Sequence, residues 1–347
     1  MESKIMPLID FSKNGNYIEK ESHIASILLF GNPNAYSDAQ ITICIPVYKR
    51  YHLIKKAIES AVNQDTDIPY QIIVVDDDPD FNNTQILEIV KSFGIDNLTY
   101  YKNRENLKLF GNLNRCGILA KTKYFALLHD DDFLMPDYID TVMSVLTKRN
   151  VDALCVAFKQ LNNPFLINIP NESMGENKNK AWFIIKKIIS KMFFFNFHNR
   201  STLVKIPLTA NMFLDNVYGP PTCGMIFKRE SFLKSGGYNQ EYYPTDDWIF
   251  MIFYSKHYTV IRLKKELAFY IWENNLSTQK KTLDEFQTQR NQIINSLVKQ
   301  DALCRFLFNC LRRDFKKKME SRIETTVSYG RLFNLVSRIF YLKLIPC

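Results

Sequence analysis

The chain lacks paired cysteines, glycine-rich phosphate loops and internal repeats. Its 7 cysteines are scattered, none forms a CxxC pair, and their number is odd. A disulfide scaffold or a zinc site is therefore not expected, and a reduced, cytosolic compartment is favoured. The sequence contains neither a P-loop nor a GxGxxG segment, so two common ways of holding a nucleotide phosphate are excluded.

Long apolar runs are also missing. Residues 1–23 contain no apolar core of the kind found in secretory signals, so no signal peptide is predicted. The apolar stretch 181–197 is broken by lysines, and no uninterrupted run reaches the roughly 18 residues that a membrane-spanning helix needs. The sequence therefore predicts no transmembrane helix.

Positive charge is in excess and unevenly placed. The formal net charge is +9, and residues 301–347 hold ten Lys or Arg against four Asp or Glu. A basic tail of this kind indicates an anionic partner, either phosphate, nucleic acid or anionic lipid.

The chain has ample material for a folded core, since 46% of its 347 residues are hydrophobic. From residue 41, short apolar runs typical of buried strands alternate with segments of helical spacing. The expected strands are 41–48, 70–80, 97–103 and 123–133, and the expected helices are 49–64, 83–94 and 111–121. This alternation predicts a parallel α/β sheet. Beyond 150 we expect further strands at 151–161 and 258–275, and helices at 180–195, 243–257 and within 279–347.

Three polar clusters follow three of the expected strands, with sequences PVYKR (46–50), DDDPD (76–80) and HDDDF (129–133). In parallel sheets, ligands bind outside the carboxyl ends of the strands. Three adjacent carboxylates repel one another unless a cation lies between them, and Mg²⁺ or Mn²⁺ prefers such oxygen ligands. The alternative is a turn or a helix cap, but a cap needs one carboxylate rather than three.

Four segments in order carry a resemblance: ITICIPVYKR, IIVVDDDPD, the run 103–139 that contains HDDDF, and GGYNQEYYPTDDW. They resemble the ordered motifs of family 2 glycosyltransferases over roughly 41–275. The resemblance implies the glycosyltransferase-A fold, a mostly parallel Rossmann-like sheet flanked by helices, here with a helical C-terminal extension. It also implies a nucleotide-diphosphate sugar donor, usually a UDP-sugar, a bound Mn²⁺ or Mg²⁺, and inversion at the anomeric carbon.

The resemblance carries site residues over position by position. Expected nucleotide contacts are Pro46, Val47, Tyr48 and Arg50 after the first strand, Asp76 and Asp77 after the second, Asn106 and Asn114 near the donor, and Asp131 at ribose or phosphate. Asp132 is the expected metal ligand, with Asp130 as the additional carboxylate beside it.

The catalytic base is expected in the TDDW segment, where Asp246 stands at the family's usual Glu position and Asp247 at its Asp position. Asp247 is our first choice, because an inverting transfer needs one carboxylate to take the proton of the acceptor hydroxyl. The alternative is that the pair only caps the following helix.

The sequence departs from the family pattern in two places. Asp78 replaces a glycine that is usual after the second strand. The segment QTQRN (287–291) has the Gln and Arg spacing of processive members but Asn291 in place of their Trp, so we expect an enzyme that adds one sugar. We expect His129 to pack or hydrogen-bond at the strand end rather than ligate the metal, since such sites favour oxygen.

The expected organisation is an N-terminal extension (1–39), a nucleotide-sugar half (40–150), an acceptor half (151–278) and a basic helical region (279–347). In that last region, 303–318 and 331–345 combine apolar and basic residues, which fits either packing on the domain or binding to anionic lipid. Lipid binding would suit a glycan or lipid-linked glycan acceptor in surface polysaccharide synthesis, at the inner, cytoplasmic face of a membrane. Alternatives are an inactive nucleotide-sugar or glycan-binding scaffold and, without a supporting motif, a nucleic-acid-binding protein.

Overall fold

The computed structural model describes residues 7–161, 204–205, 222–272, 280–302 and 304–305. The helix expected at 180–195 and the basic tail beyond 305 lie outside these residues.

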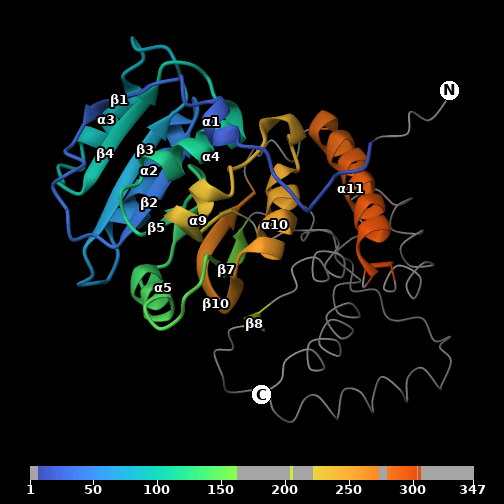
Figure 1. Cartoon of the computed structure of the whole chain (residues 1–347). Coiled ribbons are helices and arrows are strands. Elements are labelled where there is room, and N and C mark those ends of the chain that lie inside the picture. Colours follow the sequence, from blue (N-terminus) through green and yellow to red (C-terminus); the bar gives the residue numbers. More distant parts are fainter. Residues whose placement is uncertain (1–6, 162–203, 206–221, 273–279, 303, 306–347) are drawn as a thin grey trace, which may run out of the picture.

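One mixed sheet forms the centre of the molecule, with strand order β1-β4-β3-β2-β5-β9-β7-β10-β6 and β8 paired to β10 (Figure 1). The strands are β1 (Ser26–Phe30), β2 (Ile41–Val47), β3 (Tyr70–Asp76), β4 (Leu98–Asn103), β5 (Tyr124–Leu127), β6 (Phe133–Leu134), β7 (Ala153–Leu161), β8 (Val204–Lys205), β9 (Met225–Lys228) and β10 (Val260–Ile271). Strand β2 is buried at every position, as expected for a central strand covered on both faces.

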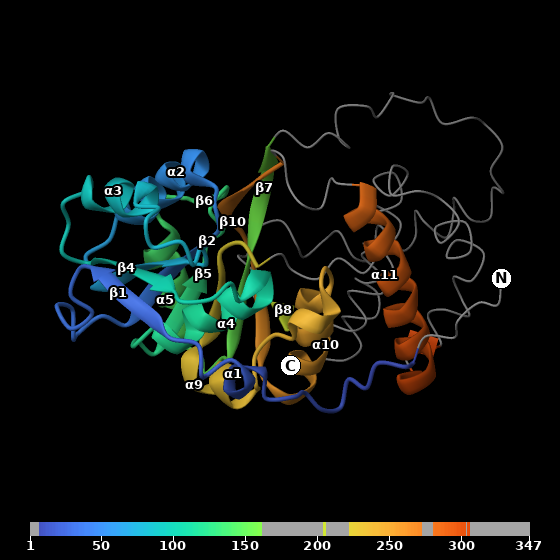
Figure 2. The ribbon, with the colours of Figure 1, turned by 90° about the horizontal axis from the view of Figure 1, so that it is seen from above.

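Helices cover both faces of the sheet. They are α1 (Tyr17–Lys20), α2 (Tyr51–Val62), α3 (Gln85–Lys91), α4 (Lys108–Leu119), α5 (Tyr138–Leu146), α9 (Arg229–Lys234), α10 (Asp246–His257) and α11 (Lys280–Gln300), with the 3₁₀ turn η1 (Gln240–Tyr242). Figure 2 shows α2 and α3 on one side of the sheet and α4 and α9 on the other. Each face has its own apolar core, one beneath α2, α3 and α5 and one beneath α4, α9, α10 and α11.

The predicted parallel arrangement is confirmed for β4, β3, β2 and β5. The chain moves outward from β2 to β3 and β4, then returns to β5 on the other side of β2, so the strand order reverses between β2 and β5. Ligand sites in such sheets lie at this reversal. Beyond β5 the sheet is mixed, because β9 starts at the carboxyl end of β5 and runs antiparallel to both β5 and β7.

The sheet continues across the boundary expected at 150/151, since β9 joins β5 to β7. The N-terminal extension is also part of the fold. The buried side chains of Ile9 and Phe11 belong to the core that α11 covers, and the chain then runs past α10 to α1 (Figures 1 and 2). Within the described part of the chain, no helix is long and apolar enough to cross a membrane.

Candidate active site

Two acidic clusters and one basic pair meet at the carboxyl edge of the parallel strands. We call Asp76–Asp78 the β3 cluster and Asp130–Asp132 the β5 cluster. Between them lie Lys49 and Arg50, which follow β2. Lys49 has a left-handed backbone (φ 55°), and the two cations reach opposite clusters: Lys49 Nζ lies 3.8 Å from Asp78 Oδ1, whereas Arg50 contacts the β5 cluster.

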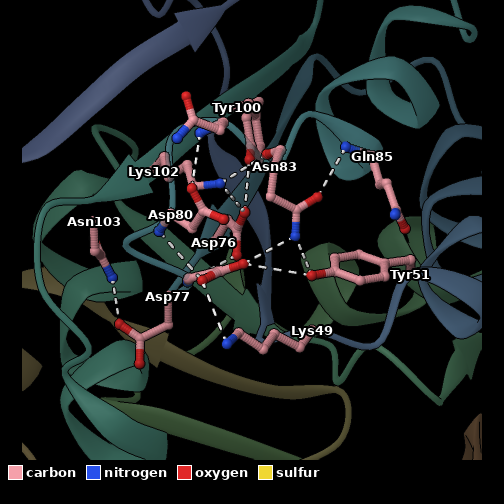
Figure 3. Close-up of polar contacts among 12 residues, drawn as sticks. Lys49, Tyr51, Asp76, Asp77, Asp80, Asn83, Gln85, Tyr100, Lys102 and Asn103 are labelled. Carbon is pink, nitrogen blue, oxygen red and sulfur yellow. Dashed lines mark hydrogen bonds and ion pairs between the residues drawn. The ribbon is translucent and has the colours of Figure 1, made fainter.

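Within the β3 cluster, Asp76 is fully engaged by protein groups (Figure 3). Its Oδ2 accepts a hydrogen bond from Tyr100 Oη at 2.7 Å and lies 3.5 Å from Lys102 Nζ, and its Oδ1 accepts the Asp78 backbone N–H at 3.0 Å. Lys102 is only 1% exposed and also donates to the Asn83 carbonyl at 2.9 Å. Burial raises the pKa of Asp76, and the Tyr100 and Lys102 contacts oppose that rise.

Asp77 is held differently. Its Oδ1 accepts both the Asn103 side-chain amide and the Leu107 backbone N–H, each at 2.9 Å, and burial raises its pKa to about 6. The other oxygen points away from the Asp76–Asp78 contacts in Figure 3. The structure therefore holds Asp77 through the Asn103 amide and the backbone at the start of α4, where the Lys108 N–H adds a further contact.

The β5 cluster is held by the Arg50 guanidinium. Arg50 Nη1 donates to Asp130 Oδ1 at 2.9 Å and Nη2 donates to Asp131 Oδ2 at 2.7 Å. Burial raises the pKa of Asp130 to about 7, against the attraction of Arg50.

Asp132 carries a buried oxygen for which the described residues supply no hydrogen-bond partner. Its side chain is 1% exposed, and its Oδ1 accepts the Ile271 backbone N–H at 2.8 Å from the end of β10. Oδ2 has no hydrogen-bond partner among the described residues. Burial raises the pKa of Asp132 well above its usual value, as does the neighbouring Asp131, while the Cys223 thiol beside it acts in the opposite direction.

The ligand atoms of His129, Asp131 and Asp132 lie within 4.8 Å of one another, so these three residues could hold a metal ion. This grouping differs from our expectation of Asp132 with Asp130. A turn in which Asp132 N–H bonds the His129 carbonyl at 3.2 Å brings residues 129 and 132 together, whereas Asp130 turns to Arg50. The hydrogen bond expected of His129 is also present, between its Nε2 and the Thr222 hydroxyl.

The other residues expected to contact the nucleotide lie at the end of β2 and at the start of α4 or within it. Pro46 and Val47 are buried in β2, and Tyr48 is 43% exposed at its end. Asn106 is exposed and accepts the Lys108 backbone N–H at 2.8 Å, which stabilises the turn before α4. Asn114 is fully buried, and its amide bonds the Tyr238 backbone at 2.7 and 2.9 Å and also contacts the Glu21 carboxylate. The structure thus gives Asn114 a structural contact away from the two clusters.

The two aspartates of TDDW open helix α10 and have different environments. Asp246 is 2% exposed, and its Oδ2 accepts the Asn239 backbone N–H. Asp247 is partly exposed, its Oδ1 accepts the Trp248 N–H at 3.0 Å, and burial raises its pKa to about 7. Of the two residues, Asp247 is the more exposed.

Topology places the start of α10 at the same edge as the two clusters. Strand β7 runs parallel to β5, because β9 is antiparallel to both, and β10 runs parallel to β7. Helix α10 leads directly into the beginning of β10, so its other end points toward the carboxyl edge. The start of α4 connects the β3 cluster with the 3₁₀ turn η1 that precedes α10. Leu107 N–H bonds Asp77, and Phe110 N–H bonds Gln240 Oε1 at 2.8 Å.

Several residues of this site were missed by the sequence reasoning. Tyr100 and Lys102 engage Asp76, and Gln289 of α11 accepts from the Thr245 hydroxyl and donates to the Tyr243 carbonyl at 2.7 Å. The alternation along β4 contained a signal, because residues 100 and 102 of a strand face the same side. Nothing in the sequence connected Gln289 with residues 243–245.

Known proteins resemble the chain in sequence and in fold. The family described as Glycosyl transferase family 2 matches residues 42–234. Uncharacterized glycosyltransferase MG060 of Mycoplasma genitalium is 28% identical over 156 residues, covering 42% of this chain and 52% of that protein. Uncharacterized protein MT1568 of Mycobacterium tuberculosis is 26% identical over 208 residues, covering 60% and 59%. The chain therefore spans less than two thirds of the length of either relative.

Crystal structures of S. aureus TarS residues 1–349 share the fold. The complex with UDP-GlcNAc has a TM-score of 0.54 at 13% identity, and the complex with UDP has 0.53 at 14%. Both alignments cover 86% of this chain and 89% of the TarS chain.

Proposed function

The chain belongs to glycosyl transferase family 2, and on that premise we propose that it is a glycosyltransferase that moves one sugar from a nucleotide-diphosphate donor, a UDP-sugar, to a hydroxyl of a glycan or lipid-linked glycan. The transfer inverts the anomeric carbon, depends on Mn²⁺ or Mg²⁺, and is not processive. The transferred sugar is a hexose or an N-acetylhexosamine.

The observation that carries this proposal is the buried Asp132 Oδ2, which has no partner in the described structure yet lies beside Asp131 and His129. An unpartnered buried carboxylate is costly unless a cation completes it. The donor set of two carboxylates and one imidazole fits Mn²⁺, and also Mg²⁺ with more water in its shell. When bound, such an ion supplies charge neutralisation for a diphosphate leaving group.

The donor would lie across the turn after β2 that contains Lys49 and Arg50, between the β3 cluster and the β5 cluster. The Asp77 carboxylate would offer an acceptor for the N–H of a uracil base, Tyr48 exposes an aromatic ring, and Arg50 adds a cation near the phosphates. The TarS complexes make UDP and UDP-GlcNAc the first nucleotides to test.

Asp247 acts as the base in this proposal. It takes the proton of the acceptor hydroxyl, and the acceptor oxygen forms a bond to the anomeric carbon from the face opposite the diphosphate. The bond from the anomeric carbon to the diphosphate oxygen breaks at the same time, and the nucleotide diphosphate leaves with the electron pair. A raised pKa suits this role, because a base with a pKa near 7 accepts a proton readily at neutral pH.

We place this reaction in surface polysaccharide synthesis, in the cytoplasm at the inner face of a membrane. The support is the combination of apolar and basic residues in 303–318 and 331–345, which suits anionic lipid and a lipid-linked acceptor. Nucleic acid is not proposed as a partner, because the positive charge accompanies large apolar residues and no nucleic-acid motif is present.

The test is hydrolysis of UDP-GlcNAc, UDP-glucose, UDP-galactose and GDP-mannose. The released nucleotide diphosphate is measured in the presence of Mn²⁺ and, separately, of EDTA. We expect Mn²⁺-dependent release from one or more UDP-sugars, and a loss of about 10²–10⁴-fold in Asp247→Asn. A scaffold would bind UDP without turnover in any variant, and metal-independent release would contradict the proposed metal.

A further inference from the structure

The loop that carries the proposed base is held at both ends by segments outside the family-matched region 42–234. We call residues 235–247 the base loop. It contains η1 and ends in the first turn of α10, so Asp247 is its last residue. Because a base must be placed closely against the acceptor hydroxyl, the groups that fix this loop bear directly on turnover.

Helix α11 holds the C-terminal end of the base loop through one side chain. Gln289 donates from Nε2 to the Tyr243 carbonyl at 2.7 Å and accepts at Oε1 from the Thr245 hydroxyl. Thr245 is the N-cap residue of α10, yet its hydroxyl makes no capping bond to that helix. A threonine in this position ordinarily accepts from a backbone N–H of its own helix. Here the hydroxyl is engaged by α11 instead.

A ring contact accompanies these hydrogen bonds. Trp248, in the first turn of α10, lies against Phe286 of α11 with ring centroids 5.4 Å apart. Phe286 and Gln289 are three residues apart and so lie on the same side of α11. One side of α11 therefore contacts residues on either side of Asp247.

The N-terminal segment 14–18 holds the other end of the base loop. Asn14 donates its amide to the Ser235 and Gly237 carbonyls at 3.0 and 2.7 Å, and the backbone N–H groups of Tyr17 and Ile18 donate to the Gly236 carbonyl at 2.9 and 3.1 Å. The contact requires glycine: Gly236 has a φ of 87°, and a Cβ there would lie 2.1 Å from the Gly15 carbonyl.

The two holding segments are themselves joined. The Ile9 backbone N–H donates to Ser296 Oγ of α11 at 3.0 Å, five residues before the start of segment 14–18. Segment 14–18 and Gln289 thus contact opposite ends of the base loop, and the bond between Ile9 and Ser296 connects the N-terminal segment to α11. The described contacts of Asp77 and the β5 cluster come from other elements, namely Arg50 after β2, strand β4, the start of α4 and strand β10.

We propose that segment 14–18 and Gln289 form a clamp on the base loop, and that Gln289 is a positioning residue for Asp247. This inference rests on the proposed role of Asp247 and goes beyond it. The clamp fixes where the proton acceptor stands without contributing to donor or metal binding. Loss of Gln289 should therefore lower kcat while leaving the affinity for UDP unchanged.

The test compares Gln289→Ala with Gln292→Ala on the same helix. Gln292 makes the same kind of amide-to-carbonyl bond, but to Pro7, which lies outside the clamp. With the UDP-sugar that the wild-type chain hydrolyses fastest, we expect Gln289→Ala to lower kcat about 10- to 100-fold, since small misplacements of a reacting group have effects of that size. The Kd for UDP with Mn²⁺ should stay within about twofold, and Gln292→Ala should change neither quantity.

Two further variants separate positioning from a general loss of packing. Thr245→Val removes only the Thr245 contact of Gln289 and keeps the Tyr243 contact, so it should lower kcat by less than Gln289→Ala does. Thr245→Ser should keep the wild-type kcat, and the double variant should be no worse than Gln289→Ala, because that variant already removes the contact with Thr245. Equal kcat in Gln289→Ala and Gln292→Ala, or a parallel loss of UDP affinity, would overturn the inference. If Asp247→Asn keeps full turnover, the proposed function fails; if it is inactive while Gln289→Ala is normal, only the clamp fails.

A readout that needs no substrate completes the test. In a Trp182→Phe/Trp272→Phe background, Trp248 is the single remaining tryptophan of the 3. Gln289→Ala should increase acrylamide quenching of Trp248 fluorescence, because the contact between α10 and α11 loosens, and Gln292→Ala should not. Equal quenching in both variants would contradict the clamp even if no donor is turned over.

Discussion

The β3 cluster and the β5 cluster are both runs of three aspartates after a parallel strand, on either side of β2, and they differ in how their charge is met. Around the β3 cluster, the carboxylates bond Tyr100, Lys102, Asn103, Asn83 and backbone N–H groups. Around the β5 cluster, one guanidinium serves Asp130 and Asp131, and Asp132 keeps a buried oxygen without a described partner.

The difference shows that an acidic run has no fixed meaning until its neighbours are known. A carboxylate whose oxygens are all engaged, such as Asp76, stabilises the turn that follows its strand. A carboxylate with a buried, unpartnered oxygen is destabilising by itself, because desolvation is not compensated. Such a group is explained when a ligand completes it, and the β5 cluster therefore differs from the β3 cluster in being prepared for a cation.

The largest effect should come from the β5 cluster. Asp132→Asn should abolish Mn²⁺ binding and lower turnover about 100- to 1000-fold, the equivalent of several kcal/mol of leaving-group stabilisation. Thermal stability should change little, because the amide oxygen of asparagine can still accept the Ile271 backbone N–H. Mn²⁺ binding is measured by electron paramagnetic resonance, with Asp78→Asn in the β3 cluster as the control that keeps it. Retained Mn²⁺ binding in Asp132→Asn would contradict our interpretation of the unpartnered oxygen.

The second effect concerns stability and belongs to the β3 cluster. Asp76→Asn leaves Lys102 buried without its ion pair, so the free energy of unfolding should fall by about 3–5 kcal/mol. Mn²⁺ binding should persist. Urea denaturation measures the loss, and adding Lys102→Met to Asp76→Asn should recover part of it, since no unpaired charge then remains. A double variant no more stable than Asp76→Asn would show that the ion pair is not the cause.

The third effect is on pH dependence and separates turnover from donor binding. Burial raises the pKa of Asp247 to about 7, so the base is largely deprotonated at pH 8 and largely protonated at pH 6. Turnover at saturating Mn²⁺ should therefore fall about tenfold from pH 8 to pH 6. UDP binding near Asp77, whose pKa is about 6, should change less over that range. A flat turnover profile down to pH 5 would exclude Asp247 as a base with a raised pKa.

The smallest effect concerns Arg50, whose guanidinium bonds Asp130 and Asp131 of the β5 cluster. Arg50→Lys cannot bridge two carboxylates with a planar fork, so it should release Asp131 from one contact. Because a partly exposed ion pair contributes about 0.2–1 kcal/mol, Mn²⁺ should bind up to about fivefold more tightly in the absence of nucleotide. Calorimetry with Mn²⁺ alone measures this change. Weaker binding would mean that Arg50 orients Asp131 for the ion rather than competing with it.

Much of the first half of the fold was predictable, because each strand and helix there follows from local periodicity. The expected strand 41–48 is β2, and the helix expected at 49–64 is α2, which buries Ile54, Ala57 and Ile58 at helical spacing. The resemblance to family 2 glycosyltransferases is confirmed by the family match. The antiparallel insertion of β9 was not predictable, because strand order depends on contacts between residues far apart in the sequence.

The site shows the same division. The sequence identified both aspartate runs and the Asp246–Asp247 pair, but it could not distinguish members within them. Asn114 bonds the backbone of Tyr238, 124 residues away, and Gln289 reaches residues 243–245 from a different helix. These contacts depend on the packing of whole elements, which no local spacing encodes.

By itself, the sequence determined the alternation of strands and helices, the family, and the placement of carboxylates after strands β3 and β5. These properties follow from side-chain polarity and spacing along a continuous chain. Only the tertiary structure decided that Arg50 binds Asp130 and Asp131, that His129 joins Asp131 and Asp132, and that Asp132 retains a buried oxygen without a described partner. The reason is physical: hydrogen-bond partners and desolvation are set by what surrounds a side chain in space, and the same three aspartates acquire different chemistry in different surroundings.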